Sequence, residues 1–302
     1  MTPEDAYATR LERLRRAWHP NPDKPEESPE NTLLALAWTA AGQPLSAVAA
    51  GASDALPGLD AAALERLDAL VAQRLAGVPL AHITGRQHFM GLELAAGPEA
   101  LIPRAETELL GRAAIDLALA TGARVAVDVC TGSGNLALAL AHHVEGLEVH
   151  GADLSEEAVG LARRNAAMLG LEQRVRFRAG DLLAPFDSPQ FHGGVDLVVC
   201  NPPYISSGKV AAMDPEISGH EPRLAFDGGT LGVSILTRLM HEAPPLLRVG
   251  GWLAFEVGTG QGTTMARRLR NDPAWDDVRE CSDGHGVVRA VLARRRADNG
   301  GT

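Results

Sequence analysis

The residues best suited to chemistry form the tetrapeptide Asn201-Pro202-Pro203-Tyr204, which directly follows the apolar run VDLVVC at 195–200. The two prolines remove two backbone donors and stiffen the loop, so the carbonyl oxygen of Pro202 remains available as an acceptor. With the side-chain oxygen of Asn201 it offers two acceptors that can receive both hydrogens of a planar NH2 group, while Tyr204 stacks on its face. Amide and guanidine nitrogens are poor nucleophiles, so holding their hydrogens and aiming the lone pair at an electrophile would be catalytic. A rigid turn that closes a strand is the alternative interpretation.

A second candidate is the turn that runs from Cys130 to Gly134, with the sequence CTGSG, between the run VAVDV at 125–129 and a helical stretch at 136–142. Glycines in such a turn let the backbone approach a ligand closely. The third glycine of the GxGxxG dinucleotide signature is missing, and a plain strand-to-helix turn stays open as an alternative. Asp153 ends the next apolar run, where its carboxylate can accept two hydrogen bonds from a ribose diol. Capping of the following helix is the alternative role for Asp153, although Ser155 can serve instead.

Asp181 ends a third run, VRFRAGD at 175–181, and its carboxylate can reach the exocyclic amine of an adenine. A solvated turn aspartate fits the same spacing. Together, a glycine turn, a diol-binding acid and an acid after the third run describe a nucleoside pocket without a phosphate cradle.

The elements that must position these residues begin after Arg104, where short β-branched runs alternate with helical stretches. The runs are VAVDV at 125–129, LEVHGAD at 147–153, VRFRAGD at 175–181, VDLVVC at 195–200 and WLAFEV at 252–257. This alternation predicts a mostly parallel sheet with helices on both faces. Such a sheet binds ligands at the carboxyl ends of its strands, where the strand order reverses.

The first eighty or so residues predict a small helical domain. Tyr7, Leu11, Leu14 and Trp18 recur at helical spacing and predict the buried face of a first helix over residues 4–17. The segment HPNPDKPEES at 19–28 contains three prolines and predicts a loop.

Two N-cap residues and a change of period complete this domain. Ser28 and Asp60 predict the starts of helices that run through Trp38 and over Ala61–Ala76. Between Ile83 and Leu101 the spacing of the apolar residues changes from the helical period, which predicts a short hairpin that joins two domains.

Composition narrows the function classes. The chain has 302 residues, of which 45% are hydrophobic and 22% charged, as expected for a folded protein of about two domains. A net charge of -10 is the wrong sign for a protein that binds nucleic acid mainly through its phosphates. The cysteines form no CxxC pair and the histidines do not pair at metal-ligand spacings, so we expect no metal site. With neither a leader-like start nor an uninterrupted apolar run of membrane-spanning length, a cytoplasmic protein is expected.

Over nearly its whole length the sequence resembles class I S-adenosylmethionine-dependent methyltransferases, and more narrowly the HemK/PrmC family of protein-glutamine N5-methyltransferases. The segments that carry the resemblance are RLAGVPLAHITGRQHF at 74–89, LIPRAETELL at 101–110, DVCTGSG at 128–134, NPPYI at 201–205, EPRLAFDGG at 221–229 and EVGTGQG at 256–262. The resemblance implies an α/β fold with a Rossmann-like, mostly parallel seven-stranded sheet, a small N-terminal helical domain and a connecting β-hairpin.

The resemblance also implies domain boundaries. They are a helical substrate-recognition domain at 1–82, the hairpin connector at 83–103, the cofactor-binding catalytic domain at 104–296 and a flexible tail at 297–302. Three features depart from the family pattern: Ala105 and Cys130 stand where the family usually has proline and glycine, and the segment WHPNPDKPEESPENTLLALAW at 18–38 is atypical.

Site residues follow from the same resemblance. The turn at 130–134 would wrap the methionine part of S-adenosylmethionine, Asp153 would hold the ribose, and Asp181 with Leu182 would flank the adenine. The implied cofactor-binding set is Asp128, Cys130, Thr131, Gly132, Ser133, Gly134, Asp153, Leu154, Asp181, Leu182 and Asn201. The implied catalytic residues are Asn201, Pro202, Pro203 and Tyr204, and the residues expected to line the substrate cleft are Arg104, Glu106 and Glu256.

The implied reaction is in-line transfer of a methyl group from S-adenosylmethionine to a planar amide nitrogen, with S-adenosylhomocysteine as product and neither a metal nor a covalent enzyme intermediate. The acceptor implied by the family is N5 of the glutamine in the Gly-Gly-Gln loop of a peptide chain release factor. Alternatives are a small amide or guanidino compound such as arginine, a nucleic-acid base, which the net charge disfavours, and a cofactor-binding protein without activity.

Overall fold

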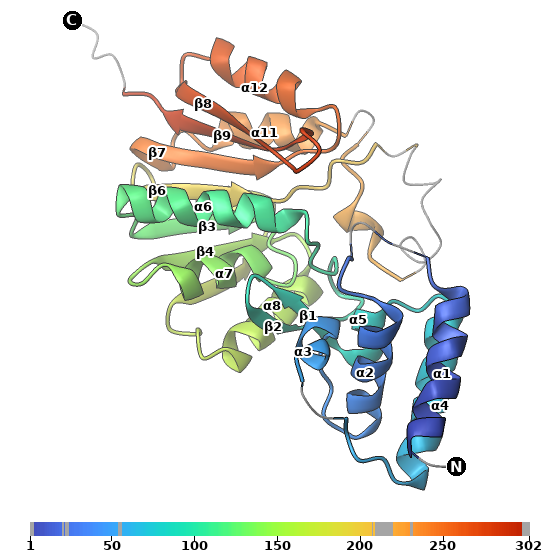
Figure 1. The fold of residues 1–302 in the computed structure, drawn as a ribbon. Coiled ribbons are helices and arrows are strands. Elements are labelled where there is room, and N and C mark those ends of the chain that lie inside the picture. Colours follow the sequence, from blue (N-terminus) through green and yellow to red (C-terminus); the bar gives the residue numbers. More distant parts are fainter. Residues whose placement is uncertain are drawn as a thin grey trace, which may run out of the picture. The chain divides into compact units, whose positions relative to one another are not determined.

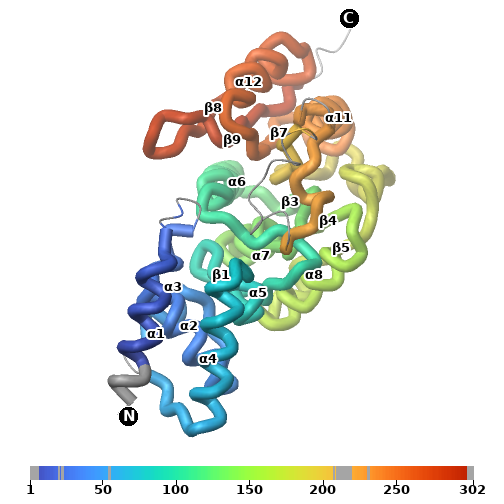
Figure 2. The backbone as a smooth tube through the Cα atoms, turned by 90° about the vertical axis from the view of Figure 1, so that its right-hand side faces the viewer, coloured from blue at the N-terminus to red at the C-terminus, as the bar shows by residue number. Residues whose placement is uncertain are grey.

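The chain divides into two compact units in the computed structural model, which describes residues 3–19, 21, 24–53, 56–206, 208, 220–229 and 232–297 (Figures 1 and 2). The first unit comprises Met1–Pro98, Ile102–Ala105 and Asp214–Glu221, and the second comprises Glu99–Leu101, Glu106–Met213 and Pro222–Thr302. Two segments lie partly outside the described residues. Residues 20, 22 and 23 of the proline-rich loop are not described, and Ala297 is the one described residue of the tail.

The second unit contains a seven-stranded sheet with the order β5-β4-β3-β6-β7-β9-β8. Its strands are β3 (Val125–Val129), β4 (Glu148–Asp153), β5 (Val175–Ala179), β6 (Val195–Cys200), β7 (Leu247–Glu256), β8 (Trp275–Ser282) and β9 (Val288–Arg295). The pairs among β3 to β7 are parallel, whereas β9 runs antiparallel to both of its neighbours. The predicted α/β class, with a mostly parallel seven-stranded sheet, is therefore confirmed.

The strand order reverses at β3. The chain moves outward from β3 through β4 to β5 and then returns to pair β6 with the other side of β3. Such a reversal separates the loops that follow the two central strands and opens a crevice between them. In this chain those loops are the glycine turn after Val129 and the NPPY loop after Cys200.

Two details of the sheet differ from the sequence pattern. Strand β7 begins at Leu247 rather than at Trp252, because Leu247 pairs with Val195 before a register shift in the ladder. The hairpin formed by β8 and β9 was not among the five apolar runs. Strand β8 is an edge strand with mostly exposed or half-exposed side chains, so its composition carries no apolar run to detect.

Helices cover both faces of this sheet. They are α6 (Thr107–Thr121), α7 (Asn135–His143), α8 (Glu156–Met168), α11 (Ser234–Glu242) and α12 (Gly262–Asn271), with short 3-10 turns at Ala184–Phe186 and Arg223–Ala225. Figure 1 shows α6 and α7 in front of the strands. Leu239 of α11 and Met265 of α12 are buried together with Val198 and Leu253 of the sheet, in the core of the opposite face. This core holds the strands rigid and so fixes where their carboxyl ends lie.

The first unit is helical, as the sequence predicts. It contains α1 (Pro3–Ala17), α2 (Pro29–Ala40), α3 (Ala47–Gly51), α4 (Ala61–Leu75) and α5 (Leu80–Thr84), followed by the antiparallel hairpin of β1 (Arg86–Phe89) and β2 (Leu92–Ala95). Both predicted N-caps are confirmed: Ser28 Oγ accepts from the Asn31 amide at 3.1 Å, and Asp60 Oδ1 accepts from the Ala63 amide at 2.7 Å. None of the described helices is long and apolar enough to span a membrane.

One predicted core residue of this unit is exposed. Helix α1 ends at Ala17, so Trp18 lies beyond the helix and is not held on its apolar face. Its indole N–H donates to the carbonyl oxygen of Glu27 at 3.1 Å, and 44% of the residue is exposed. The buried stripe of α1 therefore ends at Leu14, which is 5% exposed.

Three of the family-like segments meet inside the first unit through buried polar contacts. The Glu221 side chain, only 1% exposed, accepts from the Ile102 amide at 2.8 Å and forms an ion pair with Arg104. The Gln87 side chain donates to the carbonyl oxygen of Pro103 at 3.2 Å. These bonds join β1, the connector at 102–104 and residue 221, which are far apart in the sequence.

We expect Glu221→Ala to destabilise the protein, because it leaves the buried Arg104 guanidinium and the Ile102 amide without their acceptor. Loss of one partner from a buried ion pair costs about 3–5 kcal/mol. Urea unfolding followed by circular dichroism would measure the change. The control is Arg15→Ala, which breaks the exposed Arg15–Glu30 pair and should cost less than about 1 kcal/mol. Equal effects of the two variants would contradict the buried-pair argument.

Candidate functional site

The glycine turn after β3 has a backbone that few residues can adopt. Cys130, Gly132 and Gly134 have φ angles of +57°, +55° and +82°. A Cβ atom on Gly134 would lie 2.8 Å from Cζ of Phe177, so this position requires glycine for space as well as for conformation. Helix α7 begins directly after Gly134 and points the amides of its first turn toward the turn. The turn thus exposes backbone where a ligand can approach it closely.

Asp153 ties this turn to the end of β4. Its Oδ2 accepts from the Gly132 amide at 2.9 Å and its Oδ1 accepts from the Ser155 amide at 3.0 Å. The cap of α8 is Ser155, whose hydroxyl oxygen accepts from the Ala158 amide, so the capping alternative for Asp153 does not apply. Burial raises the pKa of Asp153, and the backbone hydrogen bonds oppose that rise. Each carboxylate oxygen keeps a lone pair for a further donor. Leu154 beside it is 58% exposed.

Two buried polar atoms at this turn lack a partner among the described residues. Asp128 is fully buried on β3, and its Oδ2 accepts from the Thr131 hydroxyl and from the Ala137 amide. Its Oδ1 has no hydrogen-bond partner in the described part of the chain, and neither has the buried hydroxyl of Ser133. Burial raises the pKa of Asp128 to about 7. Unpartnered buried polar atoms beside a glycine turn fit a polar or cationic ligand.

Asp181 has a partner that the sequence did not predict. Arg238 of α11 donates two hydrogen bonds to its carboxylate, at 3.2 and 3.1 Å. Both side chains are largely exposed. Leu182, next to it, is buried with a φ of +45°.

The NPPY loop lies directly after β6, and its two polar side chains are both held. The side-chain nitrogen of Asn201 donates to the hydroxyl oxygen of Thr107 at 3.1 Å. The Tyr204 hydroxyl lies 3.0 Å from Oε1 of Glu256 and 3.3 Å from Oε1 of Glu106. Because Nδ2 of Asn201 faces Thr107, its Oδ1 points away from that contact and remains an acceptor.

The backbone of the loop is packed against glycines. A Cβ atom on Gly228 would lie 2.6 Å from the carbonyl oxygen of Pro203, and one on Gly232 would lie 2.2 Å from that of Tyr204. The Gln261 side chain donates to the same Tyr204 carbonyl at 3.0 Å. Gly228 of the segment EPRLAFDGG and Gln261 of the segment EVGTGQG therefore both pack against the backbone of the NPPY loop.

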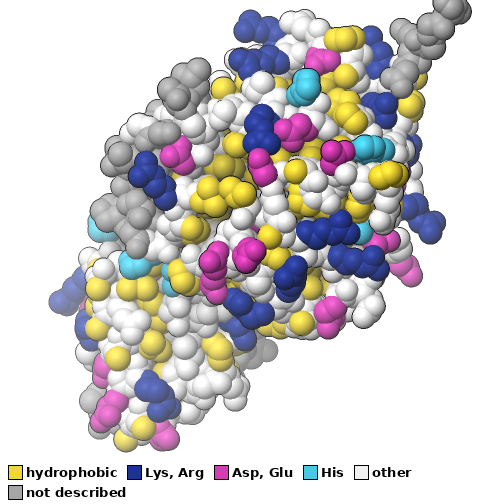
Figure 3. All heavy atoms as spheres, turned by 180° about the vertical axis from the view of Figure 1, so that it is seen from behind, with side chains coloured by type: hydrophobic (Ala, Val, Ile, Leu, Met, Phe, Trp, Pro, Cys, Tyr) yellow, Lys and Arg dark blue, Asp and Glu magenta, His cyan; other side chains and the backbone are white. Residues whose placement is uncertain are grey.

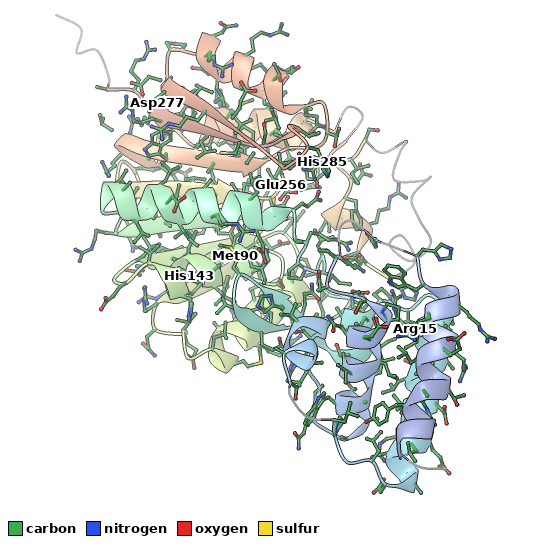
Figure 4. The ribbon with its side chains drawn as sticks, viewed as in Figure 1. Arg15, Met90, His143, Glu256, Asp277 and His285 are labelled. Carbon is green, nitrogen blue, oxygen red and sulfur yellow. The ribbon has the colours of Figure 1, made fainter. Side chains whose placement is uncertain are left out.

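Glu256 at the end of β7 is a buried acid next to this loop (Figure 4). Burial raises its pKa to about 7, although hydrogen bonds from Thr107 and Tyr204 oppose the rise. Its Oε2 has no partner among the described residues. Glu106 carries the neighbouring charge and is paired with Arg289 of β9. The second unit thus gathers two carboxyl groups around the Tyr204 hydroxyl.

The predicted site residues divide between the two units. Asn201 to Tyr204, Glu106 and Glu256 lie together in the second unit, as does the set predicted to bind the cofactor. Arg104 belongs to the first unit, where it pairs with Glu221, and its place in a substrate cleft stays a prediction. The described residues contain no group of three or more His, Cys, Asp or Glu side chains that could hold a metal ion.

Sequence reasoning did not single out Thr107, Gln261, Arg238 or Arg289. Thr107 and Gln261 lie inside the family-like segments LIPRAETELL and EVGTGQG, so those motifs could have drawn attention to them. Arg238 and Arg289 carry no local signal, because only the packing of α11 and β9 brings them to Asp181 and Glu106.

Comparison with known proteins decides the family. Residues 115–233 match the family model "Methyltransferase small domain" and residues 55–85 match "PrmC N-terminal domain". A release factor glutamine methyltransferase of Gloeobacter violaceus is 38% identical over 76% of this chain and 79% of its own length. One of Streptomyces coelicolor is 41% identical over 75% and 79%. The chain belongs to the release factor glutamine methyltransferase family. It is therefore a methyltransferase.

The fold agrees with that family. The catalytic domain of human Mettl16, solved in complex with the MAT2A 3′UTR hairpin 6, superposes with a TM-score of 0.53. The superposition covers 76% of this chain and 83% of the Mettl16 chain. The sequence identity is 18%, a level that supports the fold alone.

Asp128 gives the stability of this methyltransferase a pH dependence of known sign. Between its ordinary pKa of 3.8 and its folded pKa of about 7, the folded chain keeps a proton that the unfolded chain has lost. Stability from this group therefore falls as the pH rises through that range.

We expect Asp128→Asn to remove this loss and to stabilise the protein at pH 8 by about 1–3 kcal/mol, with little difference at pH 4. Urea unfolding at the two pH values measures it. Asp116→Asn, an exposed aspartate on α6, is the control and should change neither value. If the gain in free energy of unfolding of Asp128→Asn over the parent is no larger at pH 8 than at pH 4, the raised pKa of Asp128 is contradicted.

Proposed function

We propose that this protein transfers the methyl group of S-adenosylmethionine to N5 of the glutamine in the Gly-Gly-Gln loop of a peptide chain release factor. The observation that carries the proposal is the orientation of Asn201 after β6, whose nitrogen is held by Thr107 while its oxygen stays an acceptor. The printed function of the relatives, release factor glutamine methyltransferase, supports the choice of acceptor.

The proposed chemistry depends on how the NPPY loop would bind an amide group. The lone pair of an amide nitrogen is delocalised, so the nitrogen attacks only when it is held and aimed. Asn201 Oδ1 and the carbonyl oxygen of Pro202 would accept its two hydrogens, and the Tyr204 ring would stack on its plane. The two acceptor oxygens also stabilise the positive charge that grows on the nitrogen during transfer, and the methylated nitrogen then releases one proton to solvent.

The cofactor-binding residues are proposed on the fit of the glycine turn. S-Adenosylmethionine supplies, when bound, a methyl group on a positively charged sulfur. The backbone at 130–134 would lie along its methionine part, Asp153 would accept from the ribose hydroxyls, and Asp181 with Leu182 would border the adenine. The unpartnered Asp128 Oδ1 and Ser133 hydroxyl support this placement, because a cationic, hydrogen-bonding ligand would satisfy both.

The first unit is proposed to recognise the protein substrate, and the match of residues 55–85 to a PrmC N-terminal domain supports that role. In its atypical loop the buried Glu27 forms two ion pairs. Glu27 Oε2 lies 3.2 Å from Nη2 of Arg74 in α4, and Glu27 Oε1 lies 3.9 Å from Nζ of Lys24. We propose that the enzyme acts in the cytoplasm, where translation factors work.

One labelling experiment tests the acceptor. The purified protein is incubated with labelled S-adenosylmethionine together with a release factor, a pool of free amides and arginine, and a nucleic acid, and mass spectrometry locates the methyl group. Label on the loop glutamine supports the proposal. Label on a small molecule or a base instead would overturn it. On the face shown in Figure 3, the Lys and Arg side chains of the described residues are interspersed with Asp and Glu.

We expect Asn201→Ala to lower kcat at least about 100-fold, because one of the two acceptors is lost. Affinity for S-adenosylmethionine, measured by isothermal titration calorimetry, should change less than about twofold, since the other residues proposed to bind the cofactor lie at the ends of β3, β4 and β5. The same substitution at Asn271, exposed at the end of α12, serves as the control and should leave both values unchanged. Preserved turnover in Asn201→Ala would refute the acceptor role.

A further inference from the structure

Two carboxyl groups converge on the hydroxyl group of Tyr204 in the second unit. The hydroxyl oxygen lies 3.0 Å from Oε1 of Glu256 and 3.3 Å from Oε1 of Glu106. Glu256 ends β7 and Glu106 directly precedes α6. The fold therefore brings two acids that are remote in the sequence to a single oxygen atom.

Both contacts can be hydrogen bonds only if one of the two acids is protonated. The Tyr204 hydroxyl has one proton to donate, and a carboxylate has none. If both acids were ionised, the hydroxyl would donate to one of them, and the other carboxylate would face the lone pairs of the hydroxyl oxygen. A neutral acid removes this conflict, because it donates its own proton to the hydroxyl oxygen.

The surroundings of the two acids indicate which one is neutral. Glu106 is paired through Oε2 with the guanidinium group of Arg289, which stabilises its carboxylate. Glu256 is 1% exposed, and its Oε2 has no hydrogen-bond partner among the described residues. A buried carboxylate oxygen without a partner costs more free energy than the carbonyl oxygen of a neutral acid. These surroundings favour the proton on Glu256, and burial raises its pKa to about 7.

We infer that Glu256 is a positioning residue that, as a neutral acid, donates to the Tyr204 hydroxyl and so fixes the plane of the Tyr204 ring. The Tyr204 hydroxyl then donates to the carboxylate of Glu106, which Arg289 holds. The backbone of Tyr204 is held as well, because Gln261 donates to its carbonyl oxygen at 3.0 Å. The inference rests on the proposed function, in which this ring stacks on the acceptor amide.

Ionisation of Glu256 removes one of the two hydrogen bonds at the Tyr204 hydroxyl. The titratable and charged groups around Glu256 are Tyr204 of the NPPY loop, Glu106 before α6 and Arg289 of β9. Because Arg289 already pairs with Glu106, a second carboxylate leaves more negative than positive charge around the hydroxyl. The alignment of the ring, and with it turnover, should therefore decrease as the pH rises through about 7.

Substitutions at Glu256 test the need for a donor. Glu256→Leu, which cannot donate, should lower kcat on the order of tenfold at pH 6 with the release factor as acceptor. Glu256→Gln has an uncharged NH2 donor and should restore kcat to within about threefold of the parent. A Gln variant as slow as the Leu variant would show that Tyr204 requires a carboxylate, and would overturn the inference.

The pH dependence separates a neutral donor from an acid with a structural role alone. The ratio of the parental kcat to that of Glu256→Gln cancels the titrations that both enzymes share. This ratio should fall at least about fivefold between pH 6 and pH 9, because only the parent loses its donor. Glu280→Gln, which changes an acid of β8 paired with Arg270, is the matched control and should keep the parental profile. A constant ratio would contradict the inference.

A measurement without turnover separates this inference from the proposed function. The chain has two tyrosines, so carbon-13 at Cζ gives two NMR resonances, and that of Tyr204 is the one lost in Tyr204→Phe. It should shift with a midpoint near pH 7 in the parent and stay constant in Glu256→Gln. Tyr7, whose hydroxyl donates to the carbonyl oxygen of Pro57, is the internal reference.

The two outcomes of this measurement differ in what they overturn. A titrating Tyr204 resonance together with an unmethylated release factor would overturn the proposed function and keep the hydrogen bond from Glu256 to Tyr204. A Tyr204 resonance that does not titrate in the parent would overturn the inference, whether or not the release factor is methylated.

Discussion

The parallel pairing of β3 with β6 places Val129 opposite Cys200, and each of these residues is the last of its strand. The glycine turn follows the first and the NPPY loop follows the second, so two segments about seventy positions apart begin side by side. In sheets of this kind a reversal of strand order separates the loops that follow the two strands, and ligands bind between those loops. Every other feature of the site, from the supporting glycines to the buried acids, is arranged around these two strand ends.

This arrangement buries two acidic side chains at the ends of strands. Asp128 and Glu256 are each buried with one oxygen unpartnered among the described residues, and burial raises the pKa of both to about 7. Isolated buried carboxyl groups destabilise a fold, and active sites are where proteins retain them. Here one lies at the turn proposed for the cofactor and the other behind the loop proposed for the acceptor. The destabilised groups therefore coincide with the positions at which a reaction would use them.

The family-like segments divide into two physical roles. In the second unit, EPRLAFDGG and EVGTGQG shape the NPPY loop through glycines that leave room for its carbonyl groups and through the Gln261 side chain. In the first unit, Gln87, Arg104 and Glu221 form buried contacts that hold the connector. Motif membership alone does not separate these roles, because Arg104, which is expected to line a substrate cleft, also forms a buried ion pair with Glu221. Cys130, where the family usually has glycine, adopts a left-handed φ of +57°.

The sequence by itself determined the parts that depend on local physics. Apolar periodicity located the strands from β3 to β7, although not the full length of β7. The cap residues Ser28 and Asp60 located two helix starts, and glycine and proline marked the two loops that carry the chemistry. Those signals are local because backbone conformation and burial of one face are decided within a few residues. Tertiary structure alone decided which side chains meet: Thr107 with Asn201, Arg238 with Asp181, and Glu106 with Arg289. It also decided that Trp18 is exposed, that β8 joins the sheet, and that burial raises the pKa of Glu256 to about 7. Partners and pKa values depend on distances between residues remote in the chain, and those distances exist only once the strands have taken their register.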